Sequence, residues 1–430
     1  MEISLNLSKK SFAVYGLGVT GKSVINFFEK RKIKKYQVWD DNKILRKNFT
    51  AKTLNFNKSL DKVDYIILSP GINIKNSKFK KKLISNKKKI ITDLDLFYLI
   101  YPKTKTIVVT GTNGKSTTCK VIEHLLKKNK KNVKIGGNIG KPILDIKIKR
   151  NLTIIIEASS YHLAYSKYIK PTYAMILNIS RDHIEWHGNI KNYSDSKFKI
   201  FKFQNKKDYA LLEKNLIKRF RNKKCLGKLK IVSSESYKKI EKKIKNSYLK
   251  NNINEKNMVF VYELSKILKI KKNFFIKSFN NFKGLPHRHE MFLKINNIKF
   301  INDSKATSFQ ASKFALEAYR NIFWITGGLP KYSDKFYLNK TKQNIIKSYI
   351  IGRHANFFKK QLSNKVKFKI TKTLNQSLSL LFKEIKKIPK GKEITILFSP
   401  SSASYDQYKN FNERGNHFKK LVRFYAKKFF

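Results

Sequence analysis

The chain has few of the residues that mark several protein classes. Only two of its 430 residues are cysteines, Cys119 and Cys225, which argues against a disulfide framework and predicts a reducing cytoplasm. No apolar run reaches about 18 residues, so we expect no membrane span. The first residues, MEISLNLSKK, lack the apolar segment of a secretion signal. These absences predict a cytoplasmic protein.

Acidic residues are also scarce, because 28 Asp and Glu face 95 Lys and Arg, for a formal net charge of +67. One interpretation is nucleic-acid binding, in which a basic protein releases counterions from a phosphate backbone. The other is a biased composition, since the lysines run from Lys9 to Lys428 without forming one arm. We favour the second and expect no specific nucleic acid partner. The charge would still attract anionic substrates such as nucleotides.

Strand-like runs alternate with amphipathic helical stretches along the whole chain, and no internal repeat is present. This alternation predicts an α/β fold with helices on both faces of mostly parallel sheets. At about 150 residues per domain, the length predicts about three domains.

The first unit contains a glycine pattern typical of dinucleotide-binding folds. A strand at 12–15 leads into Gly16, Gly18 and Gly21 and then a helix, and the next strand ends at Asp40 and Asp41. A third strand lies in VDYIILSPGI. The pattern predicts a Rossmann-like unit, which would suit an NAD-dependent oxidoreductase. Alternatively, the glycines only close a tight turn between strand and helix.

The second unit begins with a phosphate-loop pattern, IVVTGTNGKSTTCKVIEHLL at 107–126. A β-branched strand, a glycine-rich turn, Lys115-Ser116 and a helix follow one another, as in a Walker A motif, but only two residues separate Gly111 from Gly114. Lys115 could neutralise phosphate charge, and the helix N-terminus could hold phosphate oxygens. Ser116 could reach a magnesium ion.

Further candidates in this unit follow apolar runs. We expect strands in LTIIIEASS, YAMILNIS, DYALL and LKIVS, and a helix in MVFVYELSKILKI. Glu157 ends the first of these runs, where it could ligate Mg²⁺ or act as a helix cap. His183, with Asn178 and Asp182 nearby, is either a ligand or structural. Lys197 looks like any other surface lysine of this chain.

The third unit begins near GLPHRHE at 284–290. We expect its strands in IKFIND, NIFWITGG, SYIIG and EITILFSP, and the last three end in small residues, where open α/β sheets bind ligands. In FINDSKATS, Asp303 could accept from ribose hydroxyls and Lys305 could meet a carboxylate or phosphate. The alternative is an ordinary capped helix.

The segments GTNGKST, EASSYHL, LNISRDHIEWHG, GLPHRHE, NDSKAT and SPSSASYDQYKNFNERG together resemble the Mur ligase family over nearly the whole chain. The resemblance implies a Rossmann-like domain at 1–97 for a UDP-sugar, a central P-loop-type domain at 98–286 for ATP and Mg²⁺, and a Rossmann-like domain at 287–430 for adenine and an amino acid. The implied reaction is ATP-dependent addition of D-glutamate to UDP-N-acetylmuramoyl-L-alanine through an acyl phosphate, in cytoplasmic peptidoglycan precursor synthesis. The implied enzyme is a monomer that uses two Mg²⁺ ions.

The resemblance also assigns roles to individual residues. The implied catalytic residues are Lys115, Glu157, His183, Lys197 and Lys305. The implied ATP contacts are Gly111, Thr112, Asn113, Gly114, Lys115, Ser116, Thr117, Asn254, Asn257, Arg288 and Asp303. The implied UDP-sugar contacts are Val19, Thr20, Asp40, Asp41, Asn42, Gly71, Asn138, Ser159 and His162. The implied D-glutamate contacts are Thr307, Lys331, Ser404 and Phe411. The implied metal ligands are Ser116, Glu157, His183 and Lys197, the last as a carbamate.

The chain departs from the family pattern at several positions. Asn251 and Ile253 stand where a Gly and a His are usual, and His162 replaces the usual Gln. Ser308 replaces an Asn after NDSKAT, and Ser402 stands where the C-terminal motif normally has Cys. These changes concern adenine and sugar contacts and leave the implied reaction class unchanged.

Overall fold

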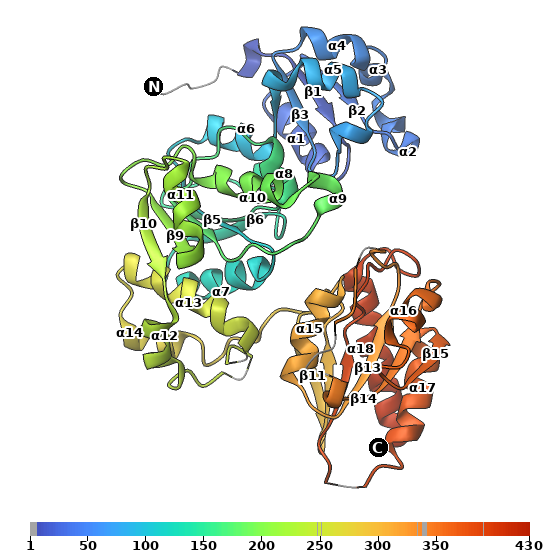
Figure 1. Ribbon diagram of the computed structural model, residues 1–430. Coiled ribbons are helices and arrows are strands. Elements are labelled where there is room, and N and C mark those ends of the chain that lie inside the picture. The colour runs from blue at the N-terminus through green and yellow to red at the C-terminus, as the bar shows by residue number, and fades with distance from the viewer. Residues whose placement is uncertain (1–6, 247, 251, 333, 338–341, 390) are drawn as a thin grey trace. The chain divides into compact units, whose positions relative to one another are not determined.

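The residues cluster by their contacts into two compact units (Figure 1). The computed structural model describes residues 7–246, 248–250, 252–332, 334–337, 342–389 and 391–430. The first unit comprises Met1–Asn246 with Asn254–Phe282, and the second comprises Ser247–Ile253 with Lys283–Phe430. Two sheets lie in the first unit and one in the second. The chain therefore has the expected α/β architecture, while the predicted boundaries at 97/98 and 286/287 stay predictions.

The first sheet is parallel, with strand order β2-β1-β3-β4. Its strands are β1 (Phe12–Tyr15), β2 (Tyr36–Trp39), β3 (Tyr65–Leu68) and β4 (Ile90–Ile91). Its helices are α1 (Val19–Lys30), α2 (Lys43–Arg46), α3 (Thr50–Thr53), α4 (Phe56–Lys62) and α5 (Lys80–Ser85). A Cβ on Gly21 would lie 1.7 Å from the carbonyl oxygen of Gly16, so only glycine permits this approach of helix to strand.

The second sheet has six parallel strands in the order β10-β9-β8-β5-β7-β6. They are β5 (Lys105–Thr110), β6 (Val133–Gly137), β7 (Thr153–Glu157), β8 (Tyr173–Ile176), β9 (Tyr209–Glu213) and β10 (Lys228–Val232). Its helices are α6 (Asp93–Ile100), α7 (Lys115–Lys128), α8 (Ser160–Tyr165), α9 (Ile184–His187), α10 (Ile190–Phe198), α11 (Ile217–Asn222), α12 (Ser234–Glu241), α13 (Asn252–Ile267) and α14 (Lys272–Ser278).

Burial explains the composition of these strands. The central strand β8, YAMI, is buried along its whole length, because helices cover both faces of the sheet. The edge strand β10, KLKIV, is largely exposed and carries lysines, which discourage pairing with another chain. In the first-unit core, Leu94 and Phe97 of α6 pack with Ile154 and Ile156 of β7.

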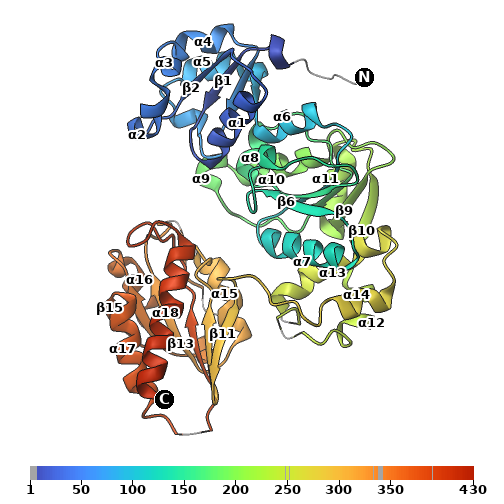
Figure 2. The same cartoon turned by 180° about the vertical axis from the view of Figure 1, so that it is seen from behind.

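The described residues of the second unit, seen from behind in Figure 2, form one sheet with order β11-β12-β16-β13-β14-β15. The β11–β12 pair is antiparallel, and the other pairs of this sheet are parallel. Its strands are β11 (Glu290–Ile295), β12 (Ile298–Asn302), β13 (Ile322–Gly327), β14 (Ile345–Ile351), β15 (Phe368–Lys372) and β16 (Ile394–Phe398). Its helices are α15 (Phe309–Ala318), α16 (Ala355–Leu362), α17 (Leu374–Ile385) and α18 (Phe411–Phe429). Separate cores on its two faces include Leu378 of α17 with Phe418 of α18, and Phe309 of α15 with Phe358 of α16.

The expected strands in all three units are present, but β4, β6, β11 and β15 were not predicted. The two-residue β4 is too short for a periodic pattern, and β6 contains Gly136 and Gly137. The partly buried β11 and the largely exposed β15 carry lysines instead of a continuous apolar run. Helix α13 begins before the apolar segment predicted at 258–270. Among the described helices, none is both long enough and apolar enough to cross a membrane.

Candidate functional site

The phosphate-loop pattern forms a tight turn between β5 and α7. The Lys115 Nζ donates hydrogen bonds to the carbonyl oxygens of Gly111 at 2.8 Å and Thr112 at 2.7 Å. The backbone N–H of Asn113 donates to Oδ1 of Asn178 at 2.9 Å, and Asn178 Nδ2 donates back to the Asn113 carbonyl. The loop is therefore held in shape by the segment that follows β8, as a preformed phosphate site requires.

Helix α13 packs directly on this loop. Gly114 has φ 83°, and a Cβ there would lie 2.1 Å from Oδ1 of Asn257. Asn257 and Asn254 are both buried, and Asn257 Nδ2 donates to Asn254 Oδ1 at 3.3 Å. The structure thus brings together the loop and these two asparagines, which lie about 140 residues further along the sequence. Two departures from the family pattern have no described side chain: Asn251 lies outside the described residues, and the side chain of Ile253 is not described.

Lys197 is the residue that the reasoning from residues alone missed. It is 0% exposed, and its Nζ donates to the carbonyl of Gly111 at 2.9 Å. Burial, with the nearby positive charge of Lys115, holds the pKa of the Lys197 ammonium well below its usual 10.5. The helical spacing of Tyr193, Lys197 and Ile200 could have predicted the burial of Lys197, because these three residues share the buried face of the segment around α10.

Glu157 ends β7 at the same carboxyl edge of the sheet as the phosphate loop. Its side chain is 4% exposed, and Oε2 has no hydrogen-bond partner in the described part of the chain. A buried carboxylate oxygen is costly unless it is paired, and Mg²⁺ would pair it. No group of three or more His, Cys, Asp or Glu gathers among the described residues, either here or at another place, so phosphate and water would have to complete the ion's ligands. The donor chemistry at Glu157 therefore fits a magnesium ion.

His183 lies at the start of α9 with φ 53°, in the left-handed region. Its Nδ1 is 2.6 Å from the hydroxyl of Tyr161, and its Nε2 is 3.3 Å from Oδ2 of Asp182. The ring of Tyr193 lies against the ring of His183, and the Tyr193 hydroxyl lies 3.0 Å from Oγ1 of Thr112 in the phosphate loop. Tyr193 is thus a neighbour of both His183 and the phosphate loop.

The remaining residues of the loop and of the UDP-sugar set lie at strand ends. Ser116 and Thr117 are buried in the first turn of α7. The Asp40 carboxylate accepts from the backbone N–H of Leu17 and of Asn42, which ties β2 to the glycine turn. Two other members of the UDP-sugar set, Ser159 and His162, are buried. The rest are exposed or partly exposed: Val19, Thr20, Asp41, Gly71 and Asn138.

In the second unit, the segment after β12 forms a buried polar cluster. Asp303 is buried and accepts from the Ser399 hydroxyl at 2.8 Å, and burial raises the pKa of its carboxyl. The Lys305 Nζ lies 3.8 Å from the centre of the Phe411 ring. Arg288 is partly buried before β11, and its backbone N–H donates to Leu285.

Arg414 was not predicted, although it joins two segments of this cluster. Its side chain is 1% exposed, and its nitrogens donate to Ser304 Oγ, the Ser304 carbonyl, and the carbonyls of Ser402 and Ala403. Burial lowers the pKa of Arg414 to about 10. Arg414 therefore fixes the spacing between the segments that follow β12 and β16.

The predicted D-glutamate residues lie at the carboxyl edge of this third sheet. Thr307 and Lys331 are partly buried, Ser404 is buried, and the Phe411 carbonyl accepts from the Ser304 hydroxyl. Two departures have clear structural roles. Ser308 caps α15 by accepting from the N–H of Ala311, and the Ser402 hydroxyl donates to the Gly327 carbonyl at 2.7 Å.

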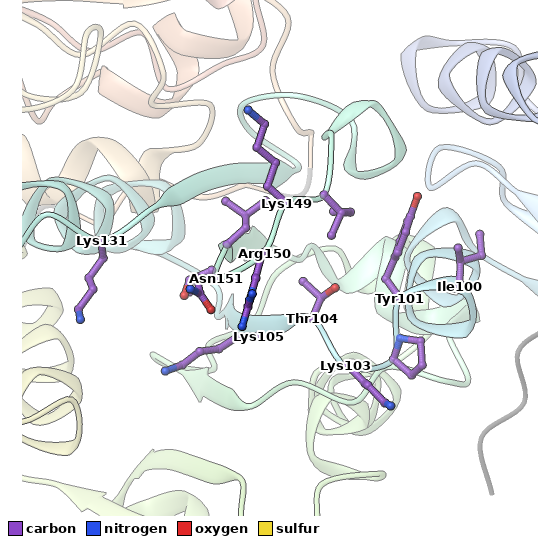
Figure 3. Close-up of a pocket in the computed structure, with 13 residues that line it drawn as sticks. Ile100, Tyr101, Lys103, Thr104, Lys105, Lys131, Lys149, Arg150 and Asn151 are labelled. Atoms are coloured by element: carbon purple, nitrogen blue, oxygen red, sulfur yellow. The ribbon is translucent and has the colours of Figure 1, made fainter.

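A basic cavity of about 960 Å³ lies away from these residues, at the amino ends of β5 and β7 (Figure 3). Its basic lining residues are Lys103, Lys105, Lys131, Lys149 and Arg150. The C-termini of α6 and α7 give this edge negative partial charge, which accounts for lysines there. In Figure 3 their ammonium groups spread apart instead of converging on one point. The cavity is therefore separate from the candidate site.

A glycine-rich turn at the carboxyl edge of a parallel sheet, with a lysine at the helix start, defines a phosphate-binding α/β protein. Two family models match the chain, and both describe domains of one family within this class. The model described as Mur ligase middle domain matches residues 109–278, and that described as Mur ligase MurD-like, N-terminal domain matches residues 10–91.

Two similar curated proteins are both named UDP-N-acetylmuramoylalanine--D-glutamate ligase. The protein from Wolbachia sp. subsp. Brugia malayi is 34% identical, over 96% of this chain and 97% of its own length. The protein from Elusimicrobium minutum is 34% identical, over 88% of this chain and 89% of its own. The chain belongs to the Mur ligase family and is a ligase.

Solved structures share the fold at much lower identity. UDP-N-acetylmuramate-alanine ligase MurC from Thermotoga maritima has a TM-score of 0.57 and 16% identity, over 96% of this chain and 99% of that one. MurF ligase from Thermotoga maritima in complex with ADP also has a TM-score of 0.57, with 14% identity, over 98% of this chain and 99% of that one.

Proposed function

We propose that the chain adds D-glutamate to UDP-N-acetylmuramoyl-L-alanine in a reaction that converts ATP to ADP and phosphate, in peptidoglycan precursor synthesis. The observation that carries the proposal is the sequence similarity to the two ligases of that name, each 34% identical to this chain over 96% and 88% of its length. The MurD-like match at 10–91 favours a UDP-sugar over NAD as the ligand of the first sheet.

ATP is proposed to bind with its phosphates on the 111–117 loop. Lys115 would exchange its contacts with the loop carbonyls for the β- and γ-phosphates, so its charge would be placed where negative charge develops. Asn254 and Asn257, with Arg288 and Asp303, are the proposed adenosine contacts. Mg²⁺ would supply further neutralisation of phosphate charge when held by Ser116, Glu157, His183 and a carbamate on Lys197.

The proposed chemistry follows from the poor reactivity of a carboxylate toward an amine. Transfer of the γ-phosphoryl group to the substrate carboxylate gives an acyl phosphate, from which the amine of D-glutamate displaces phosphate. Lys305 is proposed to neutralise the acyl phosphate and the tetrahedral oxyanion that follows it. Thr307, Lys331, Ser404 and Phe411 would hold the D-glutamate carboxylates.

The test is phosphate release from ATP, with UDP-N-acetylmuramoyl-L-alanine and one amino acid at a time. D-Glutamate should give the highest rate, and omission of any substrate should leave only background release. A higher rate with L-alanine, L-lysine or meso-diaminopimelate would overturn the proposed specificity. NAD(P)H oxidation without ATP would overturn the reaction class.

A further inference from the structure

A serine, a histidine and an aspartate form a buried line between the first two sheets. Oγ of Ser159 lies 3.2 Å from Nδ1 of His162, and Nε2 of His162 lies 3.4 Å from Oδ1 of Asp93. The exposed fractions are 7% for Ser159 and 3% for each of the other two. Asp93 begins α6, while Ser159 and His162 flank the start of α8, and these helices are neighbours in both views (Figures 1 and 2).

The unmet hydrogen-bonding capacity of this line points to a function. In the described part of the chain, neither Asp93 Oδ1 nor His162 Nε2 has a hydrogen-bond partner of good geometry. Their separation slightly exceeds the usual N–H···O range of about 2.7–3.2 Å, so a small approach would complete the bond. Because buried polar atoms are costly when unpaired, the two atoms are best satisfied by each other.

We propose that Asp93 and His162 form a proton-linked pair that determines whether Ser159 donates or accepts a hydrogen bond toward the UDP-sugar. This inference rests on the proposed function, in which Ser159 faces that substrate. His162 and Asp93 are positioning residues, because they act through Ser159.

The proton count follows from the donors and acceptors. An ionised Asp93 only accepts, so a neutral His162 carries its proton on Nε2 and leaves Nδ1 as an acceptor. Ser159 then donates its hydroxyl proton to Nδ1, while its oxygen accepts from the backbone N–H of His162. In this state Ser159 has no proton to donate to an anionic substrate group.

Protonation of His162 reverses the contact with Ser159. The imidazolium donates from Nε2 to Asp93 and from Nδ1 to Ser159 Oγ, so the hydroxyl proton becomes available for a substrate oxygen. One N–H bond forms at Nδ1 with a proton taken from solvent, and otherwise only hydrogen bonds change. The diphosphate of a UDP-sugar is the anionic group that would use this donor, and it does not itself titrate near neutral pH.

Most of the other charged groups on the surrounding elements have partners of their own. The Asp95 carboxylate of α6 accepts from the backbone N–H of Lys167 and Tyr168, and Lys199 donates to the Ala164 carbonyl. On α10, Lys197 donates to Gly111, Asp195 pairs with Arg219 and Lys223, and Lys191 is exposed. On β7, Glu157 is the remaining acidic group, and its Oε2 has no hydrogen-bond partner in the described part of the chain. Asp93 is therefore the charged group that lies against His162, with Oδ1 at 3.4 Å from Nε2.

The test is calorimetric titration of the full-length protein with UDP-N-acetylmuramoyl-L-alanine and no ATP, in two buffers of different ionisation enthalpy. Wild type should take up a proton as it binds, and its Kd should fall as the pH is lowered, by at most about tenfold per pH unit for one proton. His162→Gln should bind without that uptake, because a glutamine can contact both neighbours without titrating. Asp93→Asn should shift the uptake to lower pH.

His124→Gln is the matched control, since Nε2 of His124 contacts the Ser278 carbonyl, away from this line. This variant should keep the wild-type proton uptake. Binding without proton uptake in wild type, or equal uptake in His162→Gln, would overturn the inference. No binding of the UDP-sugar at any pH would instead overturn the proposed function.

Discussion

Lys197 donates a hydrogen bond from Nζ to the carbonyl oxygen of Gly111 at 2.9 Å, although 86 residues separate them. This contact places a fully buried amine beside the phosphate loop. Since its pKa is held well below 10.5, the amine is more readily neutral than that of an exposed lysine. A neutral amine is the form that reacts with carbon dioxide, so the environment favours the proposed carbamate.

Lys197→Ala should therefore be nearly inactive and partly rescued by acetate, which would replace the carboxylate of the carbamate. Activity of wild type should fall in carbon dioxide-depleted buffer and return with bicarbonate. Carbon-13 NMR with labelled bicarbonate should show a carbamate resonance that is missing from the variant. Normal activity of Lys197→Ala would rule out this role.

Lys115→Ala should remove nearly all ATP-dependent activity, because the phosphate loop would lose its positive charge at the transferring group. The matched control is Lys128→Ala, which removes an exposed lysine from the other end of the same helix. Steady-state phosphate release and circular dichroism should show an inactive, folded Lys115 variant and an active control. A rate within a few-fold of wild type would refute the phosphate-loop assignment.

Gly114→Ala should lower both stability and affinity for ATP. At φ 83° an alanine is strained, and its Cβ would lie 2.1 Å from Asn257 Oδ1. We expect a loss of about 1–3 kcal/mol in the free energy of unfolding, measured by urea titration. Gly18→Ala is the control, since Gly18 has φ −67° and a Cβ added there would have no atom within 4 Å. Equal stability of the two variants would contradict the prediction.

Asp95→Asn should change how stability depends on pH. Burial raises the pKa of the Asp95 carboxyl from 3.8 to about 6. Between these values the folded protein binds more protons than the unfolded chain, so this group's contribution to stability is lost as pH rises through about 6. Wild type should lose about 2 kcal/mol more than the variant between pH 4 and 7. Parallel pH profiles from urea titration would disprove the shift.

Lys331→Ala should raise the KM for D-glutamate far more than the KM for ATP. Loss of one charge-assisted contact costs about 1.5–3 kcal/mol, which is about 10- to 150-fold in affinity. Lys335→Ala, an exposed lysine in the same segment, should leave both constants unchanged. An unchanged KM for D-glutamate in Lys331→Ala would remove this residue from the amino-acid site.

Local patterns were sufficient to predict the main parallel strands and the phosphate loop. The run KTIVVT forms β5 because a strand buried on both faces needs apolar, β-branched residues. Gly114 and Lys115 are recognisable because the turn and the helix start are made by adjacent residues. Strands that contain lysines or glycines, such as β15 and β6, were not predicted, because their pairing depends on neighbours distant in the sequence.

The sequence by itself determined the α/β class, the position of the phosphate loop and, through its motifs, the resemblance to the Mur ligases. Only the tertiary structure decided which polar residues are buried and what they meet. It distinguished Lys197 from the other lysines, joined Arg414 to Ser304 and Ser402, and aligned Asp93 with His162. The physical reason is that desolvation and hydrogen bonding act between atoms that folding brings together, and neither depends on residue type alone.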